Sequence, residues 1–161
     1  VRAGFDAGAV NRLWHRAAGR YPVAAVRDGA WLGRRFTGRP GVTYLHLGVF
    51  PRLGRTARAW AVLRVGEGSV RWAELVWDGD PRSLAALDDA VAAVAREAGA
   101  ERFEAWLAGD AAAAAVLAGR GWQRREQPDG LHLTLRSFDP GLDITDLAGR
   151  FYLTMGDADL V

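Results

Sequence analysis

The sequence of 161 residues contains no cysteine and no lysine. Without thiols, the chain has no disulfide, no thiolate metal site and no cysteine nucleophile. Its 21 basic residues are all arginine and face 19 Asp and Glu, so the formal net charge is only +2. A balance this close to neutral says little about binding partners, and the distribution of the charges matters more.

Long apolar runs are missing as well. The longest, Ala111–Ala118, is mostly alanine and far shorter than the ~20 residues that a membrane-spanning helix requires. The N-terminus carries no signal-like apolar block, so we expect a cytoplasmic protein with no membrane partner. Repeats and linker-like tracts are absent, which predicts a single domain over residues 1–161. Because the chain opens at Val1 without an initiator Met, we expect it to be part of a longer chain.

Capping residues and hydrophobic spacing predict the helices, which should begin after Asp6, Asp28, Asp80 and Asp110. The third is the longest. Pro81 stands at its first position, and Leu84, Leu87 and Val91 recur on one face. This apolar stripe should therefore be the buried face of the helix.

Alternating apolar residues predict strands over residues 42–50, 57–65, 69–77, 102–107, 122–127 and 131–135. The first three should form an antiparallel meander, and the strand-helix-strand unit around residues 70–107 favours parallel pairing. The expected fold is α/β (α+β) with a mixed central sheet and the order α-α-β-β-β-α-β-α-β-β plus a C-terminal tail. This order excludes a helical bundle and a β-sandwich.

The tail, residues 137–161, holds five Asp against Arg150 alone. Its Phe151, Tyr152 and Leu153 are too apolar for a free acidic arm. We therefore expect an acidic tail that packs against the domain and supplies a strand in place of a missing first strand.

The element order is similar to that of the GNAT superfamily of acyl-CoA-dependent N-acyltransferases from its first helix onward. Residues 117–122, LAGRGW, resemble the helix-to-strand passage that GNAT proteins usually end with Gly-Phe. Residues 27–36 and 151–157 resemble segments of the C-terminal half of bacterial tandem GNAT-like proteins, in which that half is often degenerate. The resemblance implies an N-terminal GNAT domain in the same chain as the partner.

GNAT enzymes bind the pyrophosphate of acetyl-CoA on backbone N–H groups at the helix start after their fourth strand, in an Arg/Gln-x-x-Gly-x-Gly/Ala loop. By position, the resemblance assigns this cofactor contact to Trp77, Gly79, Arg82, Ser83 and Leu84. The stretch departs from the pattern because Asp78 and Asp80 would repel an anion and Pro81 lacks an N–H donor. We therefore expect tight binding of acetyl-CoA to be disfavoured.

Two further positions bear on catalysis. Many GNAT enzymes place a Tyr in the helix before the Gly-Phe passage to protonate the leaving thiolate, and this position is Leu117, which cannot donate a proton. Glu74 lies near where GNAT enzymes often hold a general base, on the face of its strand that should also carry Trp72 and Val76. Burial would raise the pKa of Glu74 towards neutrality. The alternative is a structural ion pair with an arginine of the neighbouring strand.

Residues 29–66 contain seven Arg and no carboxylate. The candidates for an anion-binding surface in this segment are Arg34, Arg35, Arg39, Arg55 and Arg58. Alternatively, the acidic tail folds back over them. The three His are dispersed, so we expect no metal site.

Three interpretations of function remain. We favour a degenerate GNAT-like domain that is the non-catalytic half of a tandem acyltransferase. The second is an active acetyl-CoA-dependent N-acyltransferase with a non-standard loop, in which Arg82 and the Ser83 and Leu84 amides contact phosphate and Glu74 is the base. The third is a module that binds nucleic acid or an acidic partner through residues 34–58. Of these two partners, nucleic acid is the less expected.

Overall fold

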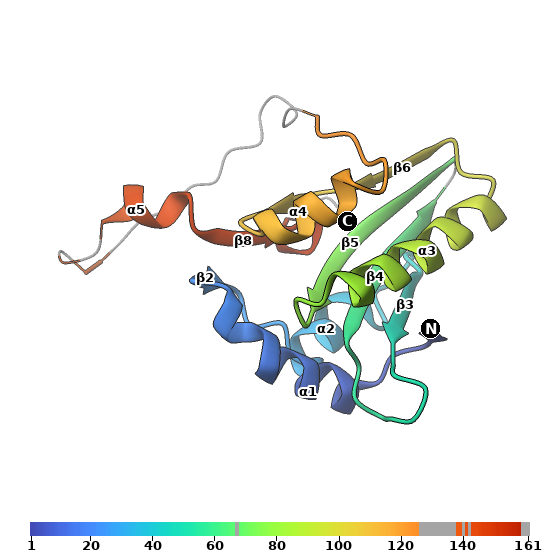
Figure 1. Cartoon of the computed structure of the whole chain (residues 1–161), viewed down its shortest axis with the longest axis horizontal. Coiled ribbons are helices and arrows are strands. Elements are labelled where there is room, and N and C mark those ends of the chain that lie inside the picture. Colours follow the sequence, from blue (N-terminus) through green and yellow to red (C-terminus); the bar gives the residue numbers. More distant parts are fainter. Residues whose placement is uncertain (67, 126–137, 140, 142, 159–161) are drawn as a thin grey trace.

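A computed structural model describes residues 1–66, 68–125, 138–139, 141 and 143–158 (Figure 1). The chain runs through β1 (Arg2–Ala3), α1 (Ala7–Ala17), the 3₁₀ turn η1 (Ala18–Arg20), β2 (Val23–Ala24), α2 (Gly29–Phe36), β3 (Tyr44–Val49) and β4 (Ala59–Gly66). It continues with β5 (Ser69–Trp77), α3 (Pro81–Glu97), β6 (Arg102–Ala105), β7 (Leu107–Ala108), α4 (Ala111–Ala118), α5 (Ile144–Ala148), β8 (Phe151–Thr154) and the 3₁₀ turn η2 (Met155–Asp157). The α/β class expected from the sequence is confirmed.

The central sheet has the strand order β1-β3-β4-β5-β6. Strands β3, β4 and β5 pair antiparallel, which is the predicted meander, and β6 pairs parallel with β5 after the α3 crossover. A smaller sheet has the order β2-β8-β7, in which β8 is parallel to β2 and antiparallel to β7. Both sheets are therefore mixed.

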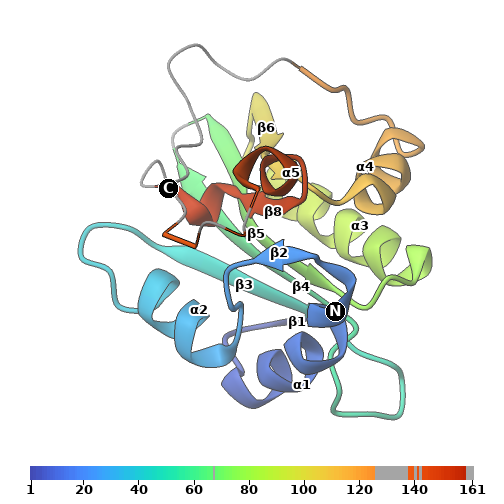
Figure 2. The ribbon, with the colours of Figure 1, turned by 90° about the vertical axis from the view of Figure 1, so that its left-hand side faces the viewer.

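Helices cover both faces of the central sheet (Figure 2). α1 and α2 enclose one core, which contains Leu13 and Trp60, and α3 and α4 enclose the other, which contains Leu63 and Leu87. None of the helices in the described part of the chain has the length and apolarity needed to cross a membrane.

Aspartate caps set the helix starts that the sequence predicts. The carboxylates of Asp6, Asp28, Asp80 and Asp110 accept hydrogen bonds from the amides of Ala9, Trp31, Arg82 and Ala113 respectively. Each bond satisfies one of the amides that a helix start leaves without a partner in the helix. The four predicted helices therefore begin where expected.

A bulge in β5 changes which face Glu74 occupies. Trp72 pairs with Leu63 and Glu74 pairs with Val62, so Ala73 is an extra residue between the two pairs. Strict alternation stops at such an insertion. The predicted common face of Glu74 and Trp72 is therefore wrong: Trp72 packs in the α3 core, whereas Glu74 contacts residues on the other side of the sheet.

The strand predictions need three corrections. The strand expected over residues 102–107 is interrupted at Trp106 and becomes β6 and β7. Residues 122–125 are not a strand, and the rest of that prediction, together with the strand over 131–135, falls outside the described residues. The edge beside β3 is occupied by β1, through pairs of Arg2 with Gly48 and Ala3 with Leu47. The tail therefore does not supply a missing first strand.

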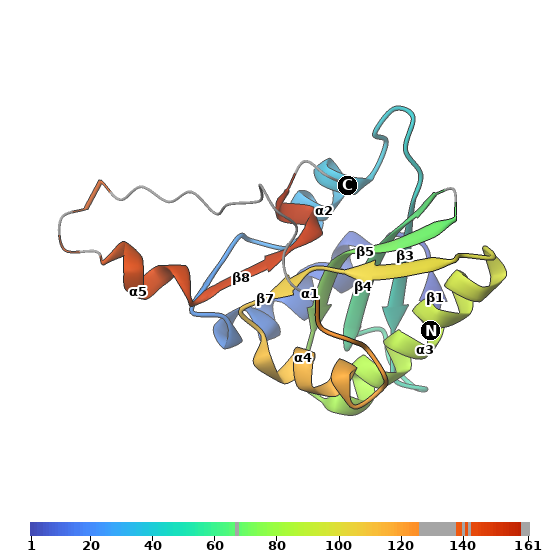
Figure 3. The same ribbon diagram turned by 90° about the horizontal axis from the view of Figure 1, so that it is seen from above.

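The tail instead reaches the other end of the domain, where Phe151 pairs with Val23 and Thr154 pairs with Leu107. These pairs join β8 to β2 and β7; β7 and β8 lie side by side in Figure 3. Tyr152, Thr154 and Met155 are buried. The preceding α5 projects from the body of the molecule (Figures 1 and 3).

Candidate functional site

The second half of β5 is where the two sheets meet. β6 pairs with β5 only from Ser69 to Trp72, and β8 contacts the part of β5 that follows. The Tyr152 hydroxyl donates to the Leu75 carbonyl at 2.6 Å, and the Thr154 hydroxyl donates to Glu74 Oε2 at 3.0 Å. The C-terminal strand therefore binds β5 through side chains beyond the point where β6 pairing ends.

Glu74, the predicted general base, is fully buried in this region. Its Oε1 accepts from Arg27 Nε at 3.0 Å and from the Leu75 amide at 2.9 Å. Turn η2 closes over it, because a Cβ added to Gly156 would lie 2.9 Å from Glu74 Oε2. Both carboxylate oxygens thus have partners within the protein, and no side of the group faces solvent.

Arg27 is the centre of the charged cluster and is itself fully buried. Besides Glu74, its guanidinium donates to Asp157 of the tail, to the Ala25 carbonyl at 2.9 Å and to the Tyr152 carbonyl at 3.4 Å. The partner of Glu74 therefore comes from the segment before α2, and the expected pair with an arginine of the neighbouring strand is wrong. The guanidinium joins β5 to the tail.

The cluster holds two carboxylates and one guanidinium. Burial disfavours the charged form of Glu74 and raises its pKa to about 7; Arg27 opposes this shift, and the negative charge of Asp157 adds to it. The predicted direction of the shift is thus the one found. A raised pKa is typical both of catalytic carboxyl groups and of buried structural ones. The two cases differ in whether a substrate can reach the carboxyl group.

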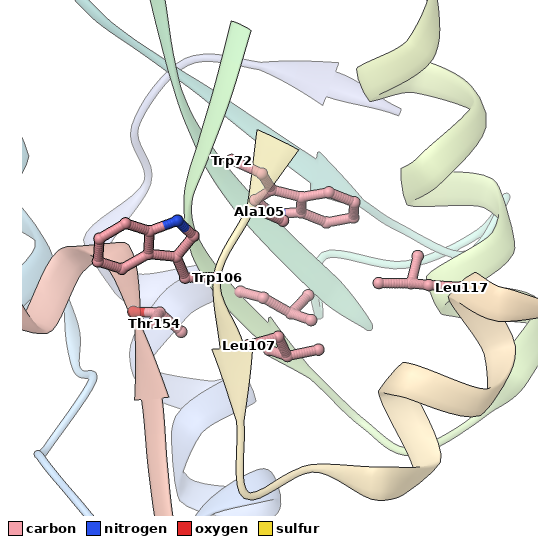
Figure 4. Close-up of a pocket in the computed structure, with 7 residues that line it drawn as sticks. Trp72, Ala105, Trp106, Leu107, Leu117 and Thr154 are labelled. Carbon is pink, nitrogen blue, oxygen red and sulfur yellow. The ribbon is translucent and has the colours of Figure 1, made fainter. Parts of the chain in front are cut away.

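A small hollow lies on the α4 side of the same region (Figure 4). Its lining consists of Trp72, Leu75, Ala105, Trp106, Leu107, Leu117 and Thr154. The cavity volume of about 10 Å³ is close to what a single water needs, and the lining is almost wholly apolar. Leu117, which stands where the resemblance implies a proton-donating Tyr, is one wall of this apolar hollow.

The start of α3, the predicted cofactor loop, satisfies its own amides. Asp80 Oδ1 accepts from the Arg82 amide at 2.9 Å, and the Asp80 carbonyl accepts from the Ser83 amide at 2.9 Å and the Leu84 amide at 3.3 Å. Asp78 Oδ1 accepts from the Asp80 amide at 3.0 Å. The N–H groups that would hold a pyrophosphate therefore already have acceptors, two of which are carboxylates.

The other two residues of this loop lie beneath Arg20. The Arg20 guanidinium sits 4.3 Å from the Trp77 ring centroid, and a Cβ on Gly79 would lie 1.7 Å from Arg20 Nη1. Gly79 has φ +90°, a conformation that favours glycine, and any side chain at this position would have to displace the Arg20 guanidinium. Trp77 is buried and donates from Nε1 to Asp110 at 2.7 Å. Of the residues assigned by position, Arg82 has an exposed side chain, whereas Ser83 and Leu84 are buried.

The basic segment divides between the two ends of β3. Arg39 donates to the Tyr44 hydroxyl at the start of β3, whereas the Arg58 amide donates to the Val49 carbonyl at its end. Six extended residues separate these ends by about 17 Å. Arg34 is exposed on α2, and Arg35 of the same helix donates to the Ala158 carbonyl in the tail. Arg58 pairs with Asp80, and Arg55 lies in the β3–β4 connection. The five candidates thus do not form one surface.

The sequence pattern does not identify the residues that complete the cluster, namely Arg27, Thr154 and Asp157. A Glu in an apolar strand indicates a cationic partner, but the sequence offers 21 arginines. Among the residues that the structure describes, no group of three or more His, Asp or Glu side chains could hold a metal ion.

Comparison with protein-family models, with curated proteins and with solved structures finds no match to this chain. The GNAT resemblance therefore stays a prediction from the element order and the local motifs.

Proposed function

We propose that this chain is a GNAT-like domain that does not bind acyl-CoA and serves as the non-catalytic half of a bacterial tandem acyltransferase in the cytoplasm. One observation carries the proposal: β8 and η2 cover Glu74, whose two oxygens are occupied by Arg27, the Leu75 amide and Thr154. An acceptor amine cannot give its proton to a carboxylate that it cannot reach.

The loop before α3 supports the same conclusion independently. A phosphate placed there would have to displace the Asp80 carboxylate from the Arg82 amide while lying beside Asp78. Pro81 contributes no N–H, so fewer donors remain than a helix start normally offers. Losing one charge-assisted hydrogen bond costs about 1.5–3 kcal/mol, which is roughly tenfold to a hundredfold in affinity.

Isothermal titration of the whole chain with acetyl-CoA tests the proposal. We expect no saturable heat up to about 1 mM ligand, which corresponds to a binding free energy weaker than roughly −4 kcal/mol. The matched variant Arg82→Ala should behave like the wild type. A micromolar Kd that Arg82→Ala weakens would contradict the proposal and favour an active acyltransferase with a non-standard loop.

A further inference from the structure

Helix α1 and the connection between β3 and β4 run side by side, and each carries exposed arginines. Arg12 Nη2 donates to the Arg55 carbonyl at 3.2 Å, and Arg16 Nη2 donates to the Ala57 carbonyl at 2.7 Å. Arg52 belongs to the same connection, and all four arginines are exposed. Arg12, Arg16, Arg52 and Arg55 together form what we call the basic end; α1 and this connection lie side by side in Figures 1 and 2.

The charge of the basic end is not neutralised within the described part of the chain, where no carboxylate lies within ion-pair distance of these four guanidinium groups. The acidic residue beside them is Asp6, which precedes α1 and caps it by accepting from the Ala9 amide. Four arginines and one aspartate leave a formal charge of +3. A surface of this kind attracts an anionic partner.

The β3–β4 connection also carries an exposed apolar side chain. Leu53, between Arg52 and Arg55, is 99% exposed. A sugar-phosphate backbone offers no apolar contact for such a residue, whereas a protein surface offers both carboxylates and apolar side chains. The guanidinium groups of Arg12 and Arg16 are also held by backbone carbonyls, and fixed guanidinium groups suit the fixed carboxylates of a folded partner.

The chain carries a complementary element in α5. Asp143 and Asp146 are exposed there, and Ile144 and Leu147 are only partly buried. Helix α5 projects from the body and lies apart from α1 and the β3–β4 connection in Figures 1 and 2. An acidic helix with apolar neighbours thus lies too far from the basic end of its own copy, but it is available to a second copy.

We propose that two copies of this chain associate reciprocally, with α5 of each copy docked on the basic end of the other. In this arrangement Asp143 and Asp146 face the arginines, and Ile144 and Leu147 meet Leu53. A reciprocal contact is isologous and closes after two copies, so it produces a dimer and not a filament.

A charge exchange between the two surfaces tests this proposal by sedimentation velocity. The first variant is Arg52→Glu with Arg55→Glu, and the second is Asp143→Asn with Asp146→Arg, in which Asn retains the helix cap. Each variant alone places like charges opposite each other and should sediment as a monomer. An equimolar mixture restores both contacts with opposite charges, and we expect a heterodimer of twice the monomer mass.

The controls separate docking from folding and from total charge. Circular dichroism checks that both variants fold. Arg96→Glu with Arg102→Glu makes the same charge change at exposed positions outside the basic end and should leave the dimer intact. The wild-type dimer should weaken as salt rises from about 0.05 to 0.5 M, since exposed charges are screened over that range.

Three results would overturn the proposal. The first is a wild-type chain that remains monomeric at every concentration tested. The second is a dimer that survives either charge reversal or fails to re-form in the mixture. The third is a monomer that binds a 20-base-pair DNA duplex, or vesicles with about 30% phosphatidylserine, through Arg52 and Arg55; that result would assign the basic end to nucleic acid or to lipid.

Discussion

Replacing Arg27 by Met should destabilise the protein more than any surface change, because it removes the cation that two buried carboxylates share. The substitution deletes the contacts to Glu74 and Asp157 and those to the Ala25 and Tyr152 carbonyls. Breaking a buried ion pair by removing one partner costs about 3–5 kcal/mol, since the other charge is left without compensation. We expect the free energy of unfolding at pH 8 to fall by about that amount.

The assay is urea unfolding followed by tryptophan fluorescence, with Glu74→Gln and the double variant completing a cycle. Glu74→Gln removes the stranded charge, so the two changes together should cost less than their sum by about 0.5–3 kcal/mol. Arg102→Met, at an exposed position, is the control and should change stability by less than about 0.5 kcal/mol. A cost below about 1 kcal/mol for Arg27→Met, or strict additivity, would refute the role given to Arg27.

Further predictions concern pH and the tail. Because burial raises the pKa of Glu74 to about 7, the folded state holds this proton more tightly than the unfolded state. The stability that results, at most about 3 kcal/mol, should be lost as the pH rises from about 4.5 to 7. The urea midpoint of the wild type should therefore fall across this pH range, and in Glu74→Gln this fall should disappear. Burial lowers the pKa of His46 to about 4, so its contribution should instead be lost as pH falls from about 6.5 to 4, and His46→Phe should flatten the acid side of the same profile. Gly109 and Gly99 both have positive φ, but only a Cβ at Gly109 meets the Phe151 carbonyl, at 2.0 Å. Gly99→Ala should therefore cost about 1–2 kcal/mol and Gly109→Ala clearly more; equal losses would mean that β8 does not lie against Gly109.

Capping residues and alternating apolar residues were sufficient to predict the helices and strands that contain them. Helix α2 begins after Asp28 as predicted, and β5 has the predicted bounds of Ser69 and Trp77. The bulge at Ala73 was not predictable, because an inserted residue leaves the composition of an apolar strand unchanged and only shifts its faces. For this reason the predicted common face of Glu74 and Trp72 was wrong, whereas Val76 does pack in the core on the Glu74 side of the sheet.

Long-range pairing explains the other differences. Strands β2 and β7 have two residues each, which is too short for a periodic pattern, and both depend on β8 from the tail. The contact of Arg27 with Glu74 spans 47 positions, and the contact with Asp157 spans 130. Such contacts depend on how the whole chain folds. The sequence therefore predicted that Glu74 is a candidate site residue, but it did not predict the partners of Glu74. The prediction that the cofactor loop binds acetyl-CoA poorly rested on Asp78, Asp80 and Pro81. These residues are neighbours in the sequence, so the prediction needed no long-range contact.

The most direct measurement of the central claim is an NMR titration of the ¹⁵N-labelled protein with coenzyme A, in which the backbone amides of Arg82, Ser83 and Leu84 are followed. Since these amides already donate to Asp80, we expect their shifts to stay unchanged up to about 1 mM ligand. Saturable shifts of these three amides with a micromolar midpoint would contradict the account.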